Sequence, residues 1–236
     1  MIAWMKDMWH YPRSLTGYGT RKTLEYLKNI NPDLNFHSFK SGSKVFDWSV
    51  PDEWNIYDAY IEHESGQRFA EFSKNNLHVL GYSIPCNMEI SLPELLLHIY
   101  TQPDQPDAIP YVTSYYSDNW GFCMSEKDKK RLPNGRYHIV IDAKKGLGTM
   151  ELADLVIRGK SDREIFFSTY VCHPSMANNE LSGPVLSSAL IQYIKEKYSL
   201  PQYTYRFVFV PETIGSIAYL SENLKKLKEK VVCGFN

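Results

Sequence analysis

The hydrophobic pattern in the last third of the chain predicts alternating strands and helices. Runs of aromatic and β-branched residues, typical of strands buried on both faces, alternate there with stretches in which apolar residues recur at helical spacing. Ser182 is the expected N-cap of the first of these helices. This alternation predicts an α/β fold built on a mostly parallel sheet with helices on both faces. The expected series is strand 164–172, helix 184–198, strand 205–210, helix 214–229 and strand 231–235.

The N-terminal segment adds two helices and one strand. An amphipathic helix is expected within residues 1–11, and a second helix over 21–30. Asn31 and Pro32 should end the second helix, because the residue before a proline is biased away from helical geometry. Alternating apolar and polar residues then predict a strand over 34–39.

The middle of the chain has a different pattern, in which short strands are separated by turn residues. One helix, 92–100, interrupts the series. This change predicts a small β-rich domain, residues 44–160, inserted between the two parts of an α/β core, residues 1–43 and 161–236. Its aromatic residues are interpreted as sheet core, or alternatively as a platform that covers a cleft or stacks on a sugar or peptide ring. The expected strands are 46–51, 57–62, 77–82, 111–116, 121–125, 137–143 and 150–158.

Composition indicates an ordinary globular protein of 236 residues, with 43% hydrophobic and 22% charged residues. The formal net charge of -1 gives no electrostatic reason to expect nucleic acid or an anionic membrane as a partner. No apolar run approaches the ~20 residues of a membrane span, and the first twelve residues lack the apolar core of a secretory signal. The four cysteines are widely spaced, which favours reduced thiols and a cytoplasmic location.

The last expected strand, 231–235, ends next to the final residue, Asn236. A loop and a covering helix would normally follow such a strand in an α/β domain, so we expect a chain that is cut short at its C-terminus. An apolar strand without a cover is also expected to favour homo-oligomerisation.

Polar residues that could carry chemistry follow two of the predicted strands. His173 comes directly after strand 164–172, Asn179 and Glu180 lie in the loop behind it, and Glu212 follows the next strand. Parallel neighbouring strands would bring these residues to one edge of the sheet, and an imidazole with carboxylates is a zinc-type ligand set. In the alternative interpretation His173 is structural, Glu180 is a solvated loop acid and Glu212 caps the following helix. Cys172 is expected to be buried filler facing away from His173, because strand neighbours point to opposite sides.

Six stretches spread over nearly the whole chain carry a family resemblance. They are RSLTGYG at 13–19, VFDWSVPDEWNIYDAYI at 45–61, NLHVLGYSIP at 76–85, QPDAIPYVTSYYSDNWGFC at 105–123, CHPSMANNELSG at 172–183 and PETIGS at 211–216. These motifs resemble a bacterial family of uncharacterised proteins with an aminopeptidase-like domain, often described as polysaccharide-biosynthesis proteins. The core of that family is similar to the co-catalytic zinc exopeptidases, with a small β-rich domain inserted into it. The resemblance therefore implies an α/β core with an inserted β-rich domain, the same two-part architecture that the hydrophobic pattern predicts.

The resemblance also implies roles for single residues. His173 matches the first zinc ligand of those peptidases, and Glu212 matches their general base. Their bridging aspartate falls on Asn179, with Glu180 one place later as a replacement, and the acid after the general base falls on Thr213. The remaining ligands would lie beyond the last residue. One or two zinc ions are the implied cofactor.

These inferences predict a zinc-dependent aminopeptidase-like amidohydrolase, in which a metal-activated water cleaves an amide or peptide bond. The substrate would be a small peptide or aminoacyl compound, its free amine held by Glu180. Arg13 and Asp47, which lie beside glycine and aromatic residues, are further candidates to reach the substrate cleft. The alternative is a non-catalytic binding module that keeps the fold and has a degenerate metal site.

Overall fold

The computed structural model describes residues 1–236, which form two compact units. The first unit contains Met1–Glu53 and Leu147–Asn236, and the second contains Trp54–Gly146. That the second unit is a domain inserted into a peptidase-like core remains a prediction.

The first unit is built on a five-stranded mixed sheet in the order β1-β10-β12-β11-β13. β11 runs parallel to both β12 and β13, whereas β10 runs antiparallel to both β1 and β12. The expectation of a mostly parallel sheet is therefore wrong. Parallel neighbours need a crossover connection, and only β11 and β12 are followed by crossover helices. The strands are β1 (Asn35–Lys40), β10 (Thr149–Ile157), β11 (Glu164–Tyr170), β12 (Thr204–Val210) and β13 (Val231–Phe235).

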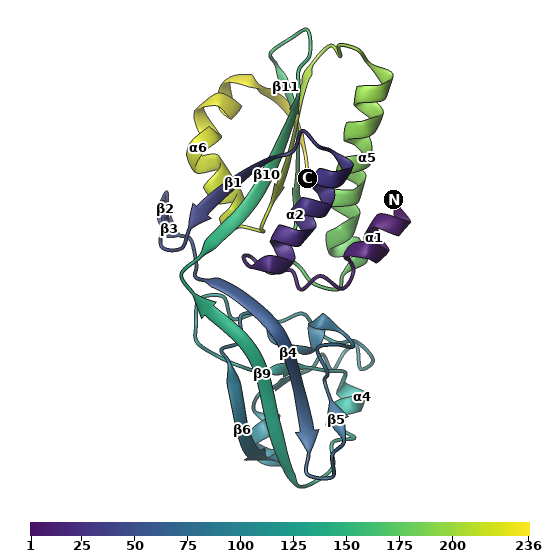
Figure 1. Cartoon of the computed structure of the whole chain (residues 1–236), viewed down its shortest axis with the longest axis vertical. Coiled ribbons are helices and arrows are strands. Elements are labelled where there is room, and N and C mark those ends of the chain that lie inside the picture. Colours follow the sequence, from purple (N-terminus) through teal and green to yellow (C-terminus); the bar gives the residue numbers. More distant parts are fainter. The chain divides into compact units, whose positions relative to one another are not determined.

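Helices cover both faces of this sheet, as the sequence predicted (Figure 1). On one face lie α1 (Ile2–Met8), α2 (Tyr18–Ile30) and α5 (Ser182–Lys197), and on the other lies α6 (Ile214–Lys230). Ser182 is not the N-cap that the pattern predicted, because the π-helical turn Ala177–Leu181 runs directly into α5. No helix combines the length and the apolar character that crossing a bilayer requires.

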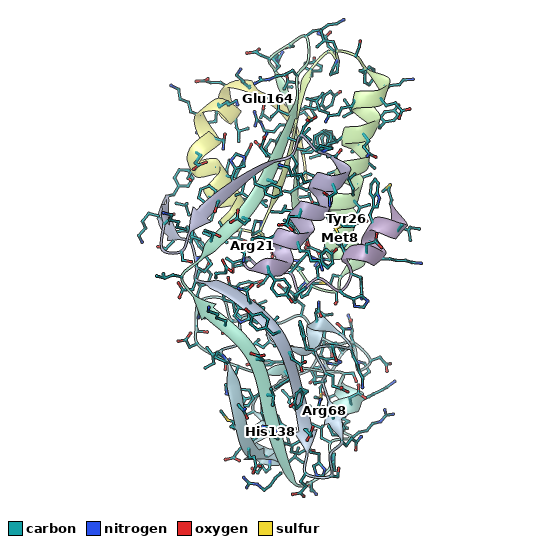
Figure 2. All side chains as sticks on the ribbon, in the orientation of Figure 1. Met8, Arg21, Tyr26, Arg68, His138 and Glu164 are labelled. Carbon is teal, nitrogen blue, oxygen red and sulfur yellow. The ribbon has the colours of Figure 1, made fainter.

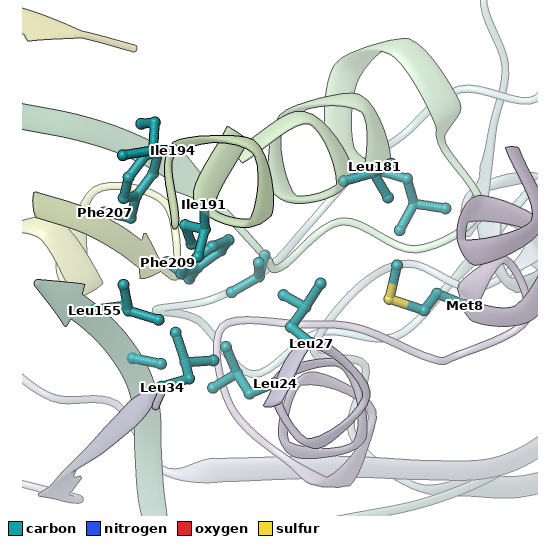
Figure 3. Packing of buried hydrophobic residues seen from close by; sticks show 13 residues of the cluster. Met8, Leu24, Leu27, Leu34, Leu155, Leu181, Ile191, Ile194, Phe207 and Phe209 are labelled. Carbon is teal, nitrogen blue, oxygen red and sulfur yellow. The ribbon is translucent and has the colours of Figure 1, made fainter. Parts of the chain in front are cut away.

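The main hydrophobic core fills the space between α2, α5 and the sheet. Met8 of α1 is fully buried there, while Trp4, Met5 and Trp9 are partly buried against the same cluster, which confirms the amphipathic first helix. Leucines of α2 and isoleucines of α5 meet phenylalanines of β12 (Figure 3). Full burial of such a side chain stabilises the fold by about 1.5–3 kcal/mol. The central residues of the cluster are Leu24, Leu27, Ile191, Ile194, Phe207 and Phe209.

The opposite face of the sheet carries a buried ionic cluster beneath α6. Arg206 of β12 binds both carboxylate oxygens of Glu164, at 2.6 and 3.0 Å (Glu164 is labelled in Figure 2). Its Nη1 also donates to Asp154 Oδ2 at 3.1 Å and to the Tyr219 hydroxyl at 3.0 Å. Tyr219 in turn donates to Asp154 at 2.7 Å. The cluster therefore ties β10, β11, β12 and α6 together.

His37 of β1 joins this cluster and is expected to make stability depend on pH. Its Nε2 lies 3.0 Å from Asp154 Oδ1, and this hydrogen bond raises the pKa of His37 above its ordinary value of 6.5. Such a contribution is fully present below the unfolded pKa and is lost as the pH rises through the folded pKa. Because the ring is 30% exposed, we expect His37→Gln to cost at most about 1 kcal/mol under acidic conditions and less under alkaline ones.

Urea unfolding of wild type and His37→Gln at about pH 5.5 and about pH 9 measures this effect. The two proteins should differ more at the lower pH. A difference that is the same at both pH values would contradict the assignment.

The second unit contains a four-stranded sheet in the order β5-β4-β9-β6. The strands predicted at 77–82 and 111–116 are wrong: Asn76–His78 forms a 3-10 helix, and Thr113 makes only an isolated bridge with Gly81. In the first of these segments loop packing buries Val79, Leu80 and Tyr82, and Tyr82 stacks on Trp54, so apolar residues are buried there without a strand. The elements are β4 (Glu53–His63), β5 (Arg68–Phe69), β6 (Cys86–Ser91), α3 (Leu92–Leu96), β7 (Ile99–Tyr100), β8 (Phe122–Cys123), α4 (Glu126–Lys129) and β9 (Arg136–Gly146).

The expected helix 92–100 is shorter than predicted. α3 ends at Leu96, although Ser91 and Glu94 form the capping box that the sequence places at its start. The segment after it turns into the short strand β7. A further pair, β2 (Lys44–Val45) and β3 (Trp48–Ser49), belongs to the first unit.

Candidate active site

The candidate site lies at the carboxyl ends of β11 and β12, which are parallel neighbours with Tyr170 opposite Val210. The chain beyond β11 leads to His173, and the chain beyond β12 leads to Glu212. His173 Nε2 lies 2.9 Å from Glu212 Oε2. The edge of the sheet therefore brings together an imidazole and a carboxylate that are 39 residues apart in the sequence.

The ionisation of His173 is governed mainly by burial. Burial lowers the pKa of His173, against the upward effects of the Glu212 carboxylate and of a hydrogen bond with the backbone of Asn179. Glu212 itself has a side chain that is 49% exposed. The pair thus combines a buried imidazole, neutral at neutral pH and able to bind a cation, with a carboxylate that solvent can reach.

Glu180 reaches the site from the π-helical turn Ala177–Leu181. Its carboxylate is fully buried, with Oε2 3.5 Å from His173 Nδ1 and Oε1 3.6 Å from Arg13 Nε. Burial raises the pKa of Glu180 to about 8, although the guanidinium of Arg13 acts to lower it. Wide helical turns of this kind are frequent at functional sites, and this one points Glu180 inward.

Asn179 occupies a different environment from Glu180. Its Oδ1 accepts a 2.7 Å hydrogen bond from the hydroxyl of Tyr170, whose ring packs edge-on to that of His173. The carboxyl group beside the Nδ1 edge of the imidazole is therefore that of Glu180.

Arg13 lies behind the site, where it is fully buried. Its Nη1 donates to the carbonyl of Met8 at 2.6 Å, and its Nε donates to the carbonyl of His173 at 2.8 Å. The glycines of its loop allow this path: Gly17 adopts a φ of 89°, and a side chain at Gly19 would overlap the backbone of Pro12. The guanidinium therefore faces protein groups instead of solvent.

Asp47 lies in an exposed turn between β2 and β3. It takes part in none of the contacts around His173 described above. The structure thus brings together four of the six residues proposed for the site, namely Arg13, His173, Glu180 and Glu212, places Asn179 next to them and leaves Asp47 outside.

Cys172 is a site residue that the sequence interpretation missed. Its thiol is fully buried, as expected, but Sγ accepts a 3.2 Å hydrogen bond from the backbone N–H of Glu212. The ligand atoms of Cys172, His173 and Glu212 all lie within 4.8 Å of one another. The argument from strand alternation fails because β11 ends at Tyr170, two residues earlier.

The donor set has the chemistry that zinc requires. Thiolate sulfur, imidazole nitrogen and carboxylate oxygen are the protein ligands of zinc, and all three are present within a space that one cation can share. Burial raises the pKa of the Cys172 thiol well above its ordinary value, so the thiol is protonated until a cation binds. The residues present fit a single zinc ion.

The fold is similar to that of solved peptidase structures. The chain resembles a zinc aminopeptidase from Bacillus subtilis with a TM-score of 0.61 at 10% identity, covering 99% of this chain and 67% of that one. An M28 peptidase precursor from Shewanella amazonensis gives the same TM-score at 12% identity, covering 96% and 67%. The chain thus has a mixed α/β fold similar to that of the M28 zinc aminopeptidases.

The chain itself belongs to the family described as Domain of unknown function (DUF4910), which matches residues 2–236. A Clostridium acetobutylicum protein named as a candidate polysaccharide biosynthesis protein with an aminopeptidase-like domain is 44% identical over 226 residues, covering 95% of this chain and 51% of that protein. The crystal structure of a candidate peptidase from the same organism gives a TM-score of 0.93 at 42% identity, covering 97% and 53%. The chain spans about half the length of these relatives.

Proposed function

We propose that this protein is a zinc-dependent hydrolase of amide or peptide bonds, acting on small peptide or aminoacyl substrates. The observation that carries the proposal is the 2.9 Å contact between His173 and Glu212 at the ends of two neighbouring parallel strands. Similarity to M28 aminopeptidases and the names of the Clostridium acetobutylicum relatives support it.

Each side chain has a role that follows from its surroundings. His173 would hold the zinc ion, which when bound supplies a Lewis acid that polarises the substrate carbonyl. Glu212 is open to solvent and accepts a proton from the attacking water. As the carbon–nitrogen bond breaks, Glu212 passes that proton to the leaving amine. Glu180 places a buried carboxyl group beside the imidazole.

We expect Glu212→Gln to lower kcat/KM for hydrolysis of aminoacyl p-nitroanilides by about 10²- to 10⁴-fold, the usual contribution of a positioned proton acceptor. The amide keeps the shape of the side chain but cannot accept the proton. Glu229→Gln, an exposed residue at the far end of α6, is the matched control. Zinc content would be measured in parallel by mass spectrometry after purification without chelators. Equal activity in the two variants would contradict the role of Glu212.

A second candidate is a binding module without catalysis. It is favoured by the buried guanidinium of Arg13, 3.6 Å from Glu180, which brings a positive charge close to the proposed metal. Absence of zinc together with hydrolysis at background level in wild type would support this second function.

A further inference from the structure

Cys172 has the position of a metal ligand. Its sulfur is within 4.8 Å of the ligand atoms of both His173 and Glu212, although the two consecutive residues would face opposite ways in a regular strand. β11 ends at Tyr170, so Cys172 and His173 lie beyond the regular strand and its alternation of side chains does not apply to them.

A backbone hydrogen bond to the sulfur also suits a thiolate. The backbone N–H of Glu212 donates to Sγ at 3.2 Å, and hydrogen bonds of this kind orient and stabilise metal ligands. A thiolate formed when a cation binds would therefore keep this hydrogen-bond donor in addition to the cation.

Arg13 is the positively charged group beside Glu180. Its Nε lies 3.6 Å from Glu180 Oε1, and both side chains are fully buried. A permanently charged guanidinium fixed by two backbone carbonyls thus stands where a second cation would otherwise balance Glu180.

We propose that this site binds one cation, with Cys172 and His173 as ligands, and that Arg13 replaces a second cation beside Glu180. The inference rests on the proposed metal dependence. It adds two features, a thiolate ligand and a stoichiometry of one cation per chain, and each distinguishes this site from a two-cation site made of imidazole and carboxylates alone.

Cobalt(II) tests the proposal, because a thiolate bound to this ion gives a charge-transfer band in the near ultraviolet, whereas nitrogen and oxygen ligands do not. The protein would be the full chain carrying Cys233→Ser, which removes the exposed thiol. We expect the band to appear on titration and to saturate at one equivalent. Cys172→Ser in this background should abolish the band and weaken binding by more than about 10-fold. Cys86→Ser, another buried cysteine but in the second unit, should change neither.

The outcomes separate this inference from the proposed function. Binding of one equivalent without the band would overturn ligation by Cys172 and leave a metal-dependent hydrolase standing. Saturation at two equivalents would overturn the role of Arg13. No binding at all would overturn the inference outright, and zinc content and hydrolysis would then decide the proposed function. The spectrum of the Cys233→Ser protein is decisive even if Cys172→Ser fails to fold.

Discussion

Replacing Arg206 with methionine is expected to destabilise the fold by about 3–5 kcal/mol, because it leaves two buried carboxylates without their counter-charge. Arg206 makes a bidentate pair with Glu164 and also contacts Asp154, and the side chains of Arg206 and Glu164 are at most 2% exposed. Methionine fills a similar volume, so the loss would come from charge and hydrogen bonding more than from packing.

Urea unfolding measures this loss, with Arg163→Met as the control, since Arg163 is exposed and precedes β11. The control should change stability by less than about 0.5 kcal/mol. Adding Glu164→Gln to Arg206→Met should recover part of the loss, because a neutral amide is less costly to bury than an unpaired carboxylate. A loss below about 1 kcal/mol for Arg206→Met would mean that water reaches the carboxylates or that they become protonated at little cost.

The sequence was informative about the strands and helices that carry the core. In residues 164–236 every expected element exists, because runs of β-branched and aromatic residues and amphipathic helices leave strong patterns. Burial on both faces holds for β12, whereas β11 is half-buried and β13 is mostly exposed. Strand pairing was harder to predict. Whether β10 runs parallel or antiparallel to β12 depends on contacts about 50 residues apart, and nothing local in either strand encodes that direction.

In the candidate site, too, the residues next to a recognisable strand could be predicted, whereas those placed by contacts distant in the sequence could not. His173 and Glu212 were identified because each follows a recognisable strand, and parallel neighbours bring their ends together. Cys172 was missed because the strand was expected to continue to residue 172, whereas β11 ends at Tyr170. The burial of Arg13 depends on a loop that folds back on Met8 and His173, and the sequence gives no measure of that burial.

Arg13→Met is expected to be the most damaging change near the site, at about 3–5 kcal/mol, because Glu180 would remain buried without a positive partner. The variant would also lose the two hydrogen bonds that join the loop to the carbonyls of Met8 and His173. Arg21→Met is a suitable control, since Arg21 forms a bidentate pair with Glu53 that is partly exposed. That pair should contribute no more than about 1 kcal/mol.

Thermal unfolding with and without a divalent cation distinguishes a positive charge that balances Glu180 from a purely structural arginine. If Arg13 stands in place of a cation, added zinc or cobalt should raise the melting temperature of Arg13→Met more than that of wild type. The added ion can bind beside Glu180 only after the guanidinium has been removed, and binding to the folded state stabilises it. An equal shift in both proteins would show that Arg13 supports the loop alone. Glu180→Gln combined with Arg13→Met should then abolish the extra shift, because the amide offers a cation no negative charge to balance.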